Sequence, residues 1–336
     1  MMNKRFKFIV LIASVTLCSV FSIFVVTNQL QSPNTQSCAK QTGMAFVQGG
    51  LFQMGAGGIY LEETPMINVK VKSFYMSRYE VSNAHFSQFV EETGYVTAAE
   101  KLPKLQDYPN ISAEQLTAGS AVFVKPSTNS QENRPMFGWR FIEGASWRQP
   151  HGPNSSIQGK EDYPVVHVAY EDALAYATWK GHRLPTEAEF EFASRGGMQG
   201  QKFATGNSLT LNNKFVANTW QGAFPYEDLA EDGHSGLAPV GCYPQNPYGL
   251  YDLIGNVWEW TNSTYYPRHF EEGKLPSGLP EEGYDSRQPG VPVGVIKGGS
   301  FLCAEGVCMR FRPAARQAQD TGLGTSHIGF RTVKDI

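Results

Sequence analysis

The sequence predicts an α+β fold: a single loop-rich domain with little regular secondary structure, preceded by an N-terminal transmembrane segment. The 34 glycines and 20 prolines among 336 residues exceed the share of roughly 12% that soluble chains average, so loops should outweigh helices and strands. Strand-like and helix-like stretches are short and follow no βαβ alternation, which argues against a parallel sheet and against a helical bundle. Hydrophobic residues make up 41% of the chain, enough for a sizeable core.

Strands are predicted from alternation and from runs of β-branched residues. Ile67, Val69 and Val71 alternate with polar residues, as in a strand with one buried face. Further β-rich runs at 165–168, 293–296 and 328–333 predict additional short strands.

Three helices are predicted from periodicity and capping residues. The first spans 82–94, with phenylalanines on one face and a glycine at its end, and the second spans about 171–180. The third begins at Thr186, where Thr186 and Glu189 have the spacing of a capping box, and it ends at the Arg-Gly-Gly stretch 195–197.

The first 42 residues differ in composition from the rest. Residues 1–7 form a basic segment expected in the cytoplasm, and the run 8–26 is uncharged. At about 1.5 Å rise per residue such a run can just cross a hydrocarbon core of roughly 30 Å, as a signal-anchor or, if cleaved, a signal peptide. Residues 27–42 are predicted to be a linker, and residues 43–336 the folded domain. We therefore expect an extracytoplasmic protein, anchored to the inner (cytoplasmic) membrane and facing the periplasm or cell exterior, or secreted.

Charge argues against nucleic acid as a partner. The formal net charge is -3, and beyond Lys4 to Lys7 no cluster of basic residues forms a phosphate-binding stripe.

Two of the five cysteines, Cys303 and Cys308, are five positions apart in a glycine-rich loop. On a helix or a strand this spacing would point the side chains apart, so the pair converges only if the loop bends, which Gly306 permits. A zinc site is disfavoured because no matching second pair of ligands is present. A structural disulfide and a pair of thiolates holding copper(I) both remain open from the residues alone.

Several stretches resemble one family in order along residues 43–336: EVSNAHFSQFVEETGY, GHRLPTEAEFEFASRGG, YGLYDLIGNVWEW, KGGSFLC and GFRTV. The family is that of the formylglycine-generating enzymes, also called sulfatase-modifying factors. The resemblance implies a C-type-lectin-like fold. The wider family shares the fold without sharing one activity, and only the cysteine pair is specific for the activity.

The resemblance implies that Cys303 and Cys308 are catalytic and hold Cu(I), with Ser300 near the copper and Trp258 shaping the pocket. The implied reaction uses O2 to convert the cysteine of a Cys-x-Pro-x-Arg motif in unfolded sulfatase chains to Cα-formylglycine. It also implies two structural Ca2+ sites. Their predicted ligands are, for the first, Asn218, Thr219, Asp232 and His234, and for the second, Asp252, Gly255, Val257 and Glu259.

Some positions depart from the family pattern. The AEGV segment between the cysteines lacks the basic and aromatic residues common there, which puts peptide preference in question. The structural cysteines of vertebrate members are replaced, which suggests a bacterial-type member, and Cys38 and Cys242, which have no matching partners in the family, are expected to be free or minor rather than catalytic. The replacing residues are Ala177, Ser194, Pro313 and Thr332.

Three alternatives to the oxidase remain. The chain could be a non-catalytic family member that binds peptides or proteins outside the cytoplasm, or a disulfide-bonded structural protein of the envelope. An iron-dependent sulfoxide synthase shares the fold but usually has an additional helical domain, for which we expect the 42 residues before Gly43 to be too few.

Overall fold

The computed structural model describes residues 38, 42–103, 112, 116–126, 138–271 and 274–336. Residues 37–336 form one compact unit. The predicted basic segment, transmembrane segment and most of the linker lie outside the described residues. Within the described ranges, no helix is long and apolar enough to cross a membrane.

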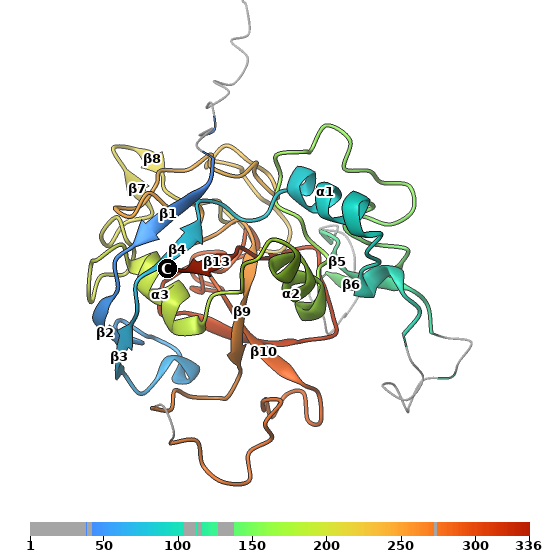
Figure 1. Cartoon of the computed structure of the whole chain (residues 1–336). Coiled ribbons are helices and arrows are strands. Elements are labelled where there is room, and N and C mark those ends of the chain that lie inside the picture. Colours follow the sequence, from blue (N-terminus) through green and yellow to red (C-terminus); the bar gives the residue numbers. More distant parts are fainter. Residues whose placement is uncertain (1–37, 39–41, 104–111, 113–115, 127–137, 272–273) are drawn as a thin grey trace, which may run out of the picture. The chain divides into compact units, whose positions relative to one another are not determined.

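The largest sheet has four strands in the order β11-β10-β9-β12. These are β9 (Trp258–Thr264), β10 (Val293–Lys297), β11 (Arg316–Asp320) and β12 (Ile328–Gly329). β10 pairs antiparallel with β9 and β11, and β12 pairs parallel with β9. Figure 1 shows β9 in the middle of the domain, between α3 and α2, with β10 beside its lower end. The loop from β10 to β11 contains both cysteines of the predicted active site.

A second sheet joins the two ends of the domain in the order β1-β4-β13. It consists of β1 (Met44–Val47), β4 (Phe74–Ser77) and β13 (Val333–Asp335). Three two-stranded hairpins complete the strands: β2 (Gly50–Met54) with β3 (Ile67–Val71), β5 (Gly119–Phe123) with β6 (Trp139–Glu143), and β7 (Thr210–Leu211) with β8 (Lys214–Phe215).

The helices are α1 (Asn83–Thr93), α2 (Tyr170–Trp179) and α3 (Glu187–Arg195), with short 3-10 turns η1 (Leu61–Glu63) and η2 (Ala98–Glu100). All three predicted helices are confirmed within about one residue. The predicted capping box exists, since Glu189 N donates to Thr186 Oγ1 at 3.1 Å and Thr186 N donates to Glu189 Oε2 at 2.8 Å.

Aromatic residues build the main core between α1, α2 and the central sheet. Phe86 contacts Trp147, Tyr176 and Phe330 with ring centroids 5.1 to 6.3 Å apart. The same cluster extends to Trp258 and Cys303, so the cysteine loop packs directly on the core. A second cluster fills the space between α3, β2 and the β1-β4-β13 sheet.

Two strand predictions needed correction. Residues 165–168 are buried but form no strand, because His167 has a φ of 62° and because Val165 N donates to Val81 O whereas His167 N donates to Thr325 O, on a different segment. The run 328–333 splits into β12 and β13, which belong to different sheets. The predictions for 67–71 and 293–296 are confirmed as β3 and β10.

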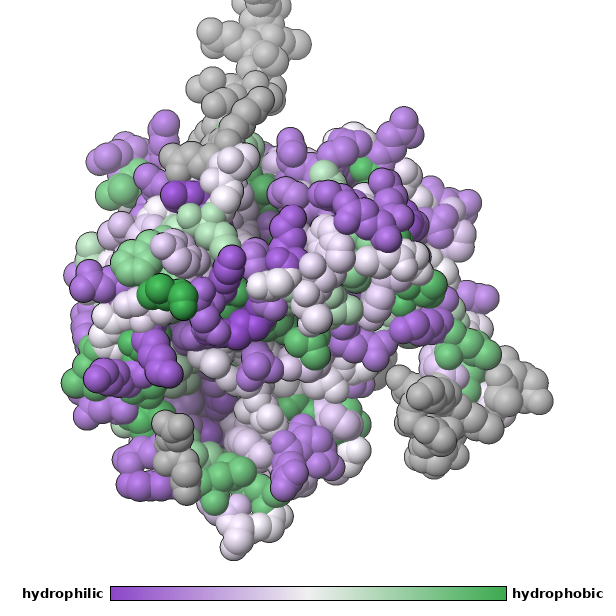
Figure 2. Space-filling view, viewed as in Figure 1, coloured by the Kyte–Doolittle hydropathy of each residue, from purple (hydrophilic) through white to green (hydrophobic). Residues whose placement is uncertain are grey.

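The visible surface is mostly polar. Figure 2 shows hydrophilic side chains over most of this face, with hydrophobic side chains in small scattered groups. Such a distribution is ordinary for a folded domain in water.

Candidate active site

The cysteine loop bends back on itself. Cys308 N donates to Ala304 O at 2.9 Å, and Val307 N donates to the same carbonyl at 3.2 Å. Gly306 has a φ of 89°, a conformation that glycine adopts without strain. The bend places Cys303 Sγ and Cys308 Sγ 3.2 Å apart as unbonded thiols. The predicted convergence of the two cysteines is therefore confirmed.

The two arms of this loop meet at its base. Gly299 has a φ of 75°, and a Cβ atom there would lie 2.7 Å from Arg310 O, so only glycine fits this approach. Ser300 follows, fully buried, with its carbonyl accepting from Cys303 N at 2.9 Å and its hydroxyl accepting from Leu302 N at 3.3 Å. These contacts make Ser300 a turn residue at the base of the loop, and its predicted place near a copper centre stays a prediction.

The two thiols differ in acidity because one donates to the other. The hydrogen bond from Cys303 lowers the pKa of Cys308 to about 7, with help from the Arg310 backbone N–H and from the Arg310 and Arg312 charges. The same hydrogen bond, together with burial, raises the pKa of Cys303 well above its ordinary value. The first thiolate of the pair is therefore that of Cys308, with the Cys303 thiol as its donor. Thiolate is the form that binds soft metal ions.

The arginines after Cys308 are paired with carboxylates. Arg312 forms two hydrogen bonds with the buried Glu63, at 2.5 and 3.0 Å, and Arg310 pairs with Glu62. Both guanidinium groups lie over the ring of Tyr60, at 4.2 Å for Arg310 and 5.6 Å for Arg312. These two ion pairs fasten η1 to the cysteine loop.

Trp258 begins β9 and is buried in the core cluster that also contains Cys303 and contacts Cys308. Its predicted role in shaping the active-site pocket stays a prediction. Trp260 is fully buried in the same cluster, and its indole Nε1 donates to Val168 O at 2.9 Å.

Sequence reasoning missed a group of aromatic residues beside the cysteines. Trp220 N donates to Cys303 O at 3.1 Å, and the Trp220 ring lies 5.1 Å from Phe224 and 6.0 Å from Phe123. Phe123 also contacts Trp139, at 5.8 Å. These residues come from three distant segments, so no local pattern in the sequence could have linked them to the site.

Residues 305–307 of the AEGV segment lie at the protein surface, whereas Ala304 is buried. The side chain of Val307 is 62% exposed, and Glu305 Oε1 lies 3.7 Å from Lys202 Nζ as an exposed ion pair. The segment in which this chain departs from the family pattern is therefore open to contact by another molecule.

The state of Cys38 and Cys242 differs from the one expected from the sequence. Cys38 and Cys242 were expected to be free, but they form a disulfide across 204 positions. Neighbouring residues in this loop bind candidate calcium ligands: Gly241 N donates to Asp252 Oδ2 at 2.5 Å, and the Tyr243 hydroxyl donates to Asp232 O at 3.3 Å.

The predicted ligands of the first calcium site come together. Asp232 Oδ2 accepts from Thr219 N at 2.8 Å, and its Oδ1 accepts from His234 N at 3.1 Å. Asn218 donates through Nδ2 to Gly236 O at 2.8 Å, and its buried Oδ1 has no partner among the described residues. A buried oxygen without a donor fits a cation ligand, whereas both Asp232 oxygens already accept N–H bonds.

The second predicted site has a similar unpaired oxygen. Asp252 Oδ2 accepts from Gly241 N, and the buried Oδ1 has no partner in the described structure. Glu259 is less available, since its two oxygens accept from Arg331 at 2.7 and 2.8 Å. Gly255 is tightly packed, because a Cβ there would lie 2.3 Å from Asn218 O.

The two predicted calcium sites are linked through Asn256, which stands between Gly255 and the buried Val257. Asn256 N donates to Asn218 O at 2.9 Å, and Asn218 Nδ2 donates to Asn256 Oδ1 at 3.0 Å. The described residues contain no group of three or more His, Cys, Asp or Glu side chains arranged to hold a metal. Calcium at either site would depend on amide and backbone carbonyl oxygens as well as carboxylates.

Glu80 is a buried acid that the sequence did not single out. It accepts from Asn256 Nδ2 at 3.1 Å through Oε1, and its Oε2 forms no hydrogen bond in the described structure. Burial, and next the charge of Asp252, raise the pKa of Glu80 well above its ordinary value. Burial likewise raises the pKa of Asp252 to about 6 and the pKa of Glu259. Among the described residues, Arg331 is the only arginine paired with this group of three acids, and it contacts Glu80 and Glu259.

Residues 29–336 match the family model of the sulfatase-modifying factor enzyme 1-like domain. The formylglycine-generating enzyme of Mycobacterium tuberculosis is 43% identical over 88% of this chain and 98% of its own length. The chain belongs to the formylglycine-generating enzyme family. The formylglycine-generating enzyme of Bos taurus is 40% identical over 88% of this chain and 75% of its own.

The family also contains members without the activity. A mouse protein named inactive Cα-formylglycine-generating enzyme 2 is 39% identical over 87% of this chain and 86% of its own. PvdO from Pseudomonas aeruginosa shares the fold, with a TM-score of 0.57, 22% identity, and coverage of 89% of this chain and 100% of that one. Family membership and the loop-rich fold are thus established.

Proposed function

We propose that this protein is an aerobic, copper-dependent oxidase that converts the cysteine of a Cys-x-Pro-x-Arg motif in sulfatases to formylglycine. The observation that carries the proposal is the reduced pair Cys303 and Cys308, whose sulfurs lie 3.2 Å apart next to the core. Two converging thiols are a donor set suited to a soft ion such as copper(I). The wider match to formylglycine-generating enzymes supports a sulfatase-activating role.

Copper bound by Cys303 and Cys308 would supply the one-electron and oxygen chemistry of the reaction. The substrate thiol, O2, two electrons and two protons give the aldehyde, hydrogen sulfide and water, so an external reductant is required. Cys308 enters as the first thiolate because Cys303 donates to it. Trp258, buried in the same cluster as Cys303, excludes water from one side of the sulfurs, and Ser300 fixes the turn that positions Cys303.

The surface around the cysteines suits an extended peptide. The half-buried Phe123 and Phe224, packed on the buried Trp220, supply aromatic contact area, and the exposed Glu305 and Val307 form a rim on the cysteine loop. Such a rim would contact the residues that flank the target cysteine of an unfolded sulfatase chain. Glu305, an acid near the reacting sulfurs, favours peptides with basic flanking residues.

Calcium and an extracytoplasmic location are further parts of the proposal. Asn218 Oδ1 and Asp252 Oδ1 are buried oxygens without donors in the described structure, as cation ligands would be. The Cys38–Cys242 disulfide supports an oxidising compartment, such as the periplasm or the cell exterior. An anchor in residues 8–26 would hold the domain at the membrane where sulfatase chains emerge.

Mass spectrometry of a synthetic Cys-x-Pro-x-Arg peptide tests the proposed reaction. The full-length chain, purified in mild detergent and loaded with copper(I), is incubated with the peptide, air and a reductant. We expect the mass change that replaces the thiol by an aldehyde oxygen, and its loss in Cys303→Ala and Cys308→Ala. No conversion, beside an active formylglycine-generating enzyme as control, would contradict the proposal.

The second candidate function is a non-catalytic peptide- or protein-binding module. It is favoured by the exposed AEGV segment, in which the aromatic residue common before the second cysteine is absent, and by the inactive mouse relative. This function predicts peptide binding without conversion, with equal affinity in the wild type and in Cys303→Ala.

A further inference from the structure

The cysteine loop begins and ends at two cations that face each other. Lys297 is the last residue of β10 and Arg316 is the first residue of β11, and the two are direct partners in the antiparallel ladder. Both residues are buried, at 0% and 3% exposed. Like charges directly opposite each other destabilise a strand pair, and the low dielectric of the interior strengthens their repulsion. The base of the cysteine loop therefore needs a negative charge.

Glu187, the first residue of α3, supplies this charge. Its Oε1 accepts from Arg316 Nε at 2.7 Å and lies 3.6 Å from Lys297 Nζ, and its Oε2 accepts from Arg316 Nη2 at 2.9 Å. One turn later, Glu191 Oε2 lies 3.1 Å from Lys297 Nζ. Among the described ion pairs, Glu187 is the only acid that contacts both facing cations. The helix thus connects the two strands from which the cysteine loop extends.

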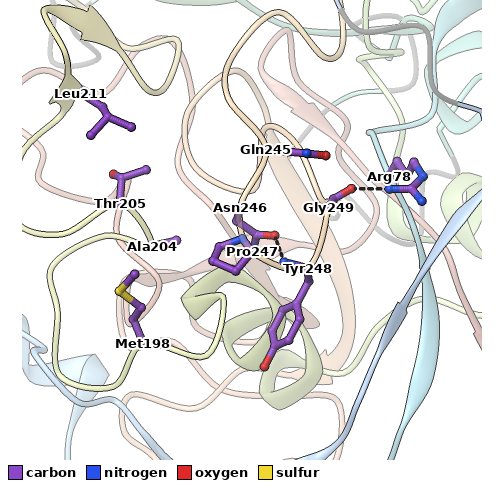
Figure 3. Close-up of a pocket in the computed structure, with 10 residues that line it drawn as sticks. All are labelled: Arg78, Met198, Ala204, Thr205, Leu211, Gln245, Asn246, Pro247, Tyr248 and Gly249. Carbon is purple, nitrogen blue, oxygen red and sulfur yellow. Dashed lines mark hydrogen bonds between the residues drawn. The ribbon is translucent and has the colours of Figure 1, made fainter.

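The helix itself is fixed at both ends, so Glu187 has a defined position. At its start, Glu187 N donates to Ser263 Oγ of β9 at 3.0 Å. At its end, Asn246 Nδ2 donates to Ala193 O at 2.7 Å. Figure 3 shows the turn that contains Asn246, closed by a hydrogen bond from Tyr248 N at 3.0 Å, on the wall of an open pocket of about 780 Å³. A helix held at both ends can carry a carboxylate that sets the position of its neighbours.

We propose that Glu187 is a positioning residue for the cysteine pair. It neutralises Lys297 and Arg316 at the base of the loop, which keeps the two arms together and the two sulfurs converged. Its carboxylate contacts neither sulfur among the described contacts, so it acts through the two strands. Glu187 is not among the site residues implied by the family resemblance. Its importance for catalysis rests on the proposed function, whereas the convergence of the sulfurs can be measured without any reaction.

Binding of phenylarsine oxide to the copper-free protein tests this inference. One arsenic(III) centre condenses with two thiols and releases one water molecule, so its affinity reports whether two sulfurs converge. The full-length chain, purified in mild detergent and freed of copper, is titrated under anaerobic conditions at constant pH, with Cys303→Ala as the blank. Glu187→Gln keeps the size of the side chain but leaves two buried cations uncompensated. We expect it to bind the arsenical at least tenfold more weakly than the wild type.

Glu189→Gln is the matched control. Glu189 lies on the same helix and also pairs with an arginine, Arg183, at 2.7 Å, but this arginine is not on the cysteine loop or its strands. The control should lower the melting temperature and bind the arsenical within twofold of the wild type. A purely structural role of Glu187 would likewise lower the melting temperature of Glu187→Gln and leave its arsenical affinity unchanged.

A second substitution separates charge compensation from packing. Lys297→Met removes one of the facing cations and leaves Glu187 paired with Arg316, so its arsenical affinity should stay within about threefold of the wild type. In the double variant Glu187→Gln/Lys297→Met the repulsion is gone, and we expect its affinity to recover to within about threefold of Lys297→Met. If Glu187→Gln alone does not fold, a double variant that folds and binds the arsenical supports the proposal.

Four results would overturn the proposal. They are wild-type affinity in Glu187→Gln, equal weakening in Glu187→Gln and Glu189→Gln, no recovery in the double variant, and a double variant that does not fold. Peptide conversion is assayed separately. A wild type that binds the arsenical but converts no peptide would contradict the proposed function and leave the role of Glu187 in the thiol pair intact.

Discussion

The two cysteine pairs of this protein have opposite states. Cys38 and Cys242 are 204 positions apart and form a disulfide, whereas Cys303 and Cys308 are five positions apart and remain thiols with sulfurs 3.2 Å apart. The distant pair joins the start of the domain to the buried loop around Cys242. The near pair lies against the core, beside two arginines. Closeness in sequence therefore does not decide which cysteines form a disulfide. The near pair remains as two thiols, the form in which both can bind a metal ion.

The largest difference between the pairs should be in activity. Cys303→Ala and Cys308→Ala each remove a sulfur on which the proposed reaction depends, so we expect peptide conversion to fall at least about a thousandfold, as when a member of a catalytic unit is lost. Cys38→Ser should retain conversion within several-fold at 20 °C. Mass spectrometry of the peptide measures both, and equal loss in all three variants would contradict the division of roles.

The free energy of unfolding should show the reverse order, with the larger loss in the variant of the distant pair. Cys38→Ser opens a loop of 204 positions, for which the chain-entropy estimate is about 5 kcal/mol, and native disulfides typically contribute about 2 to 5 kcal/mol. Denaturant unfolding measures the loss. Cys303→Ala is the control and should change the free energy of unfolding much less, because no bond is broken. If Cys38→Ser were as stable as the wild type, the disulfide would have no structural role.

The near pair should also show an unequal thiol acidity. In copper-free enzyme, alkylation by iodoacetamide should begin at Cys308, with a rate that rises through about pH 7 and then levels, since its pKa is lowered to about 7. Arg310→Met removes a positive charge and should move this midpoint upward, towards the ordinary cysteine range near about 8.5. Alkylation at a series of pH values, followed by peptide mapping, identifies which cysteine is modified first. If Cys303 were alkylated before Cys308, the assignment of Cys308 as the more acidic thiol would be wrong.

The smallest effect is expected at the rim of the near pair. Glu305→Gln breaks an exposed ion pair with Lys202, which should change the free energy of unfolding by less than about 0.5 kcal/mol. Its effect should appear instead in the KM for peptides with basic flanking residues, which we expect to rise severalfold while kcat changes little. An unchanged KM across basic and neutral peptides would remove Glu305 from substrate selection.

Local sequence patterns predicted the helices well and the sites only in part. Thr186 and Glu189 form their capping box because both partners lie within one turn, so sequence contains all the information needed. The Cys38–Cys242 bond, the aromatic residues around Trp220 and the buried Glu80 depend on contacts between distant segments. The run 165–168 had strand composition but pairs with two different segments, so burial alone produced the pattern.

Copper(I) titration is the most direct test of the central claim that Cys303 and Cys308 form the reactive metal-binding pair. Competition with a chromogenic copper(I) chelator under anaerobic conditions would measure stoichiometry and affinity in the wild type, Cys303→Ala, Cys308→Ala and Cys38→Ser. We predict one tightly bound copper ion in the wild type and in Cys38→Ser, and none in either variant of the near pair. Tight copper binding that survives Cys303→Ala and Cys308→Ala would contradict the account.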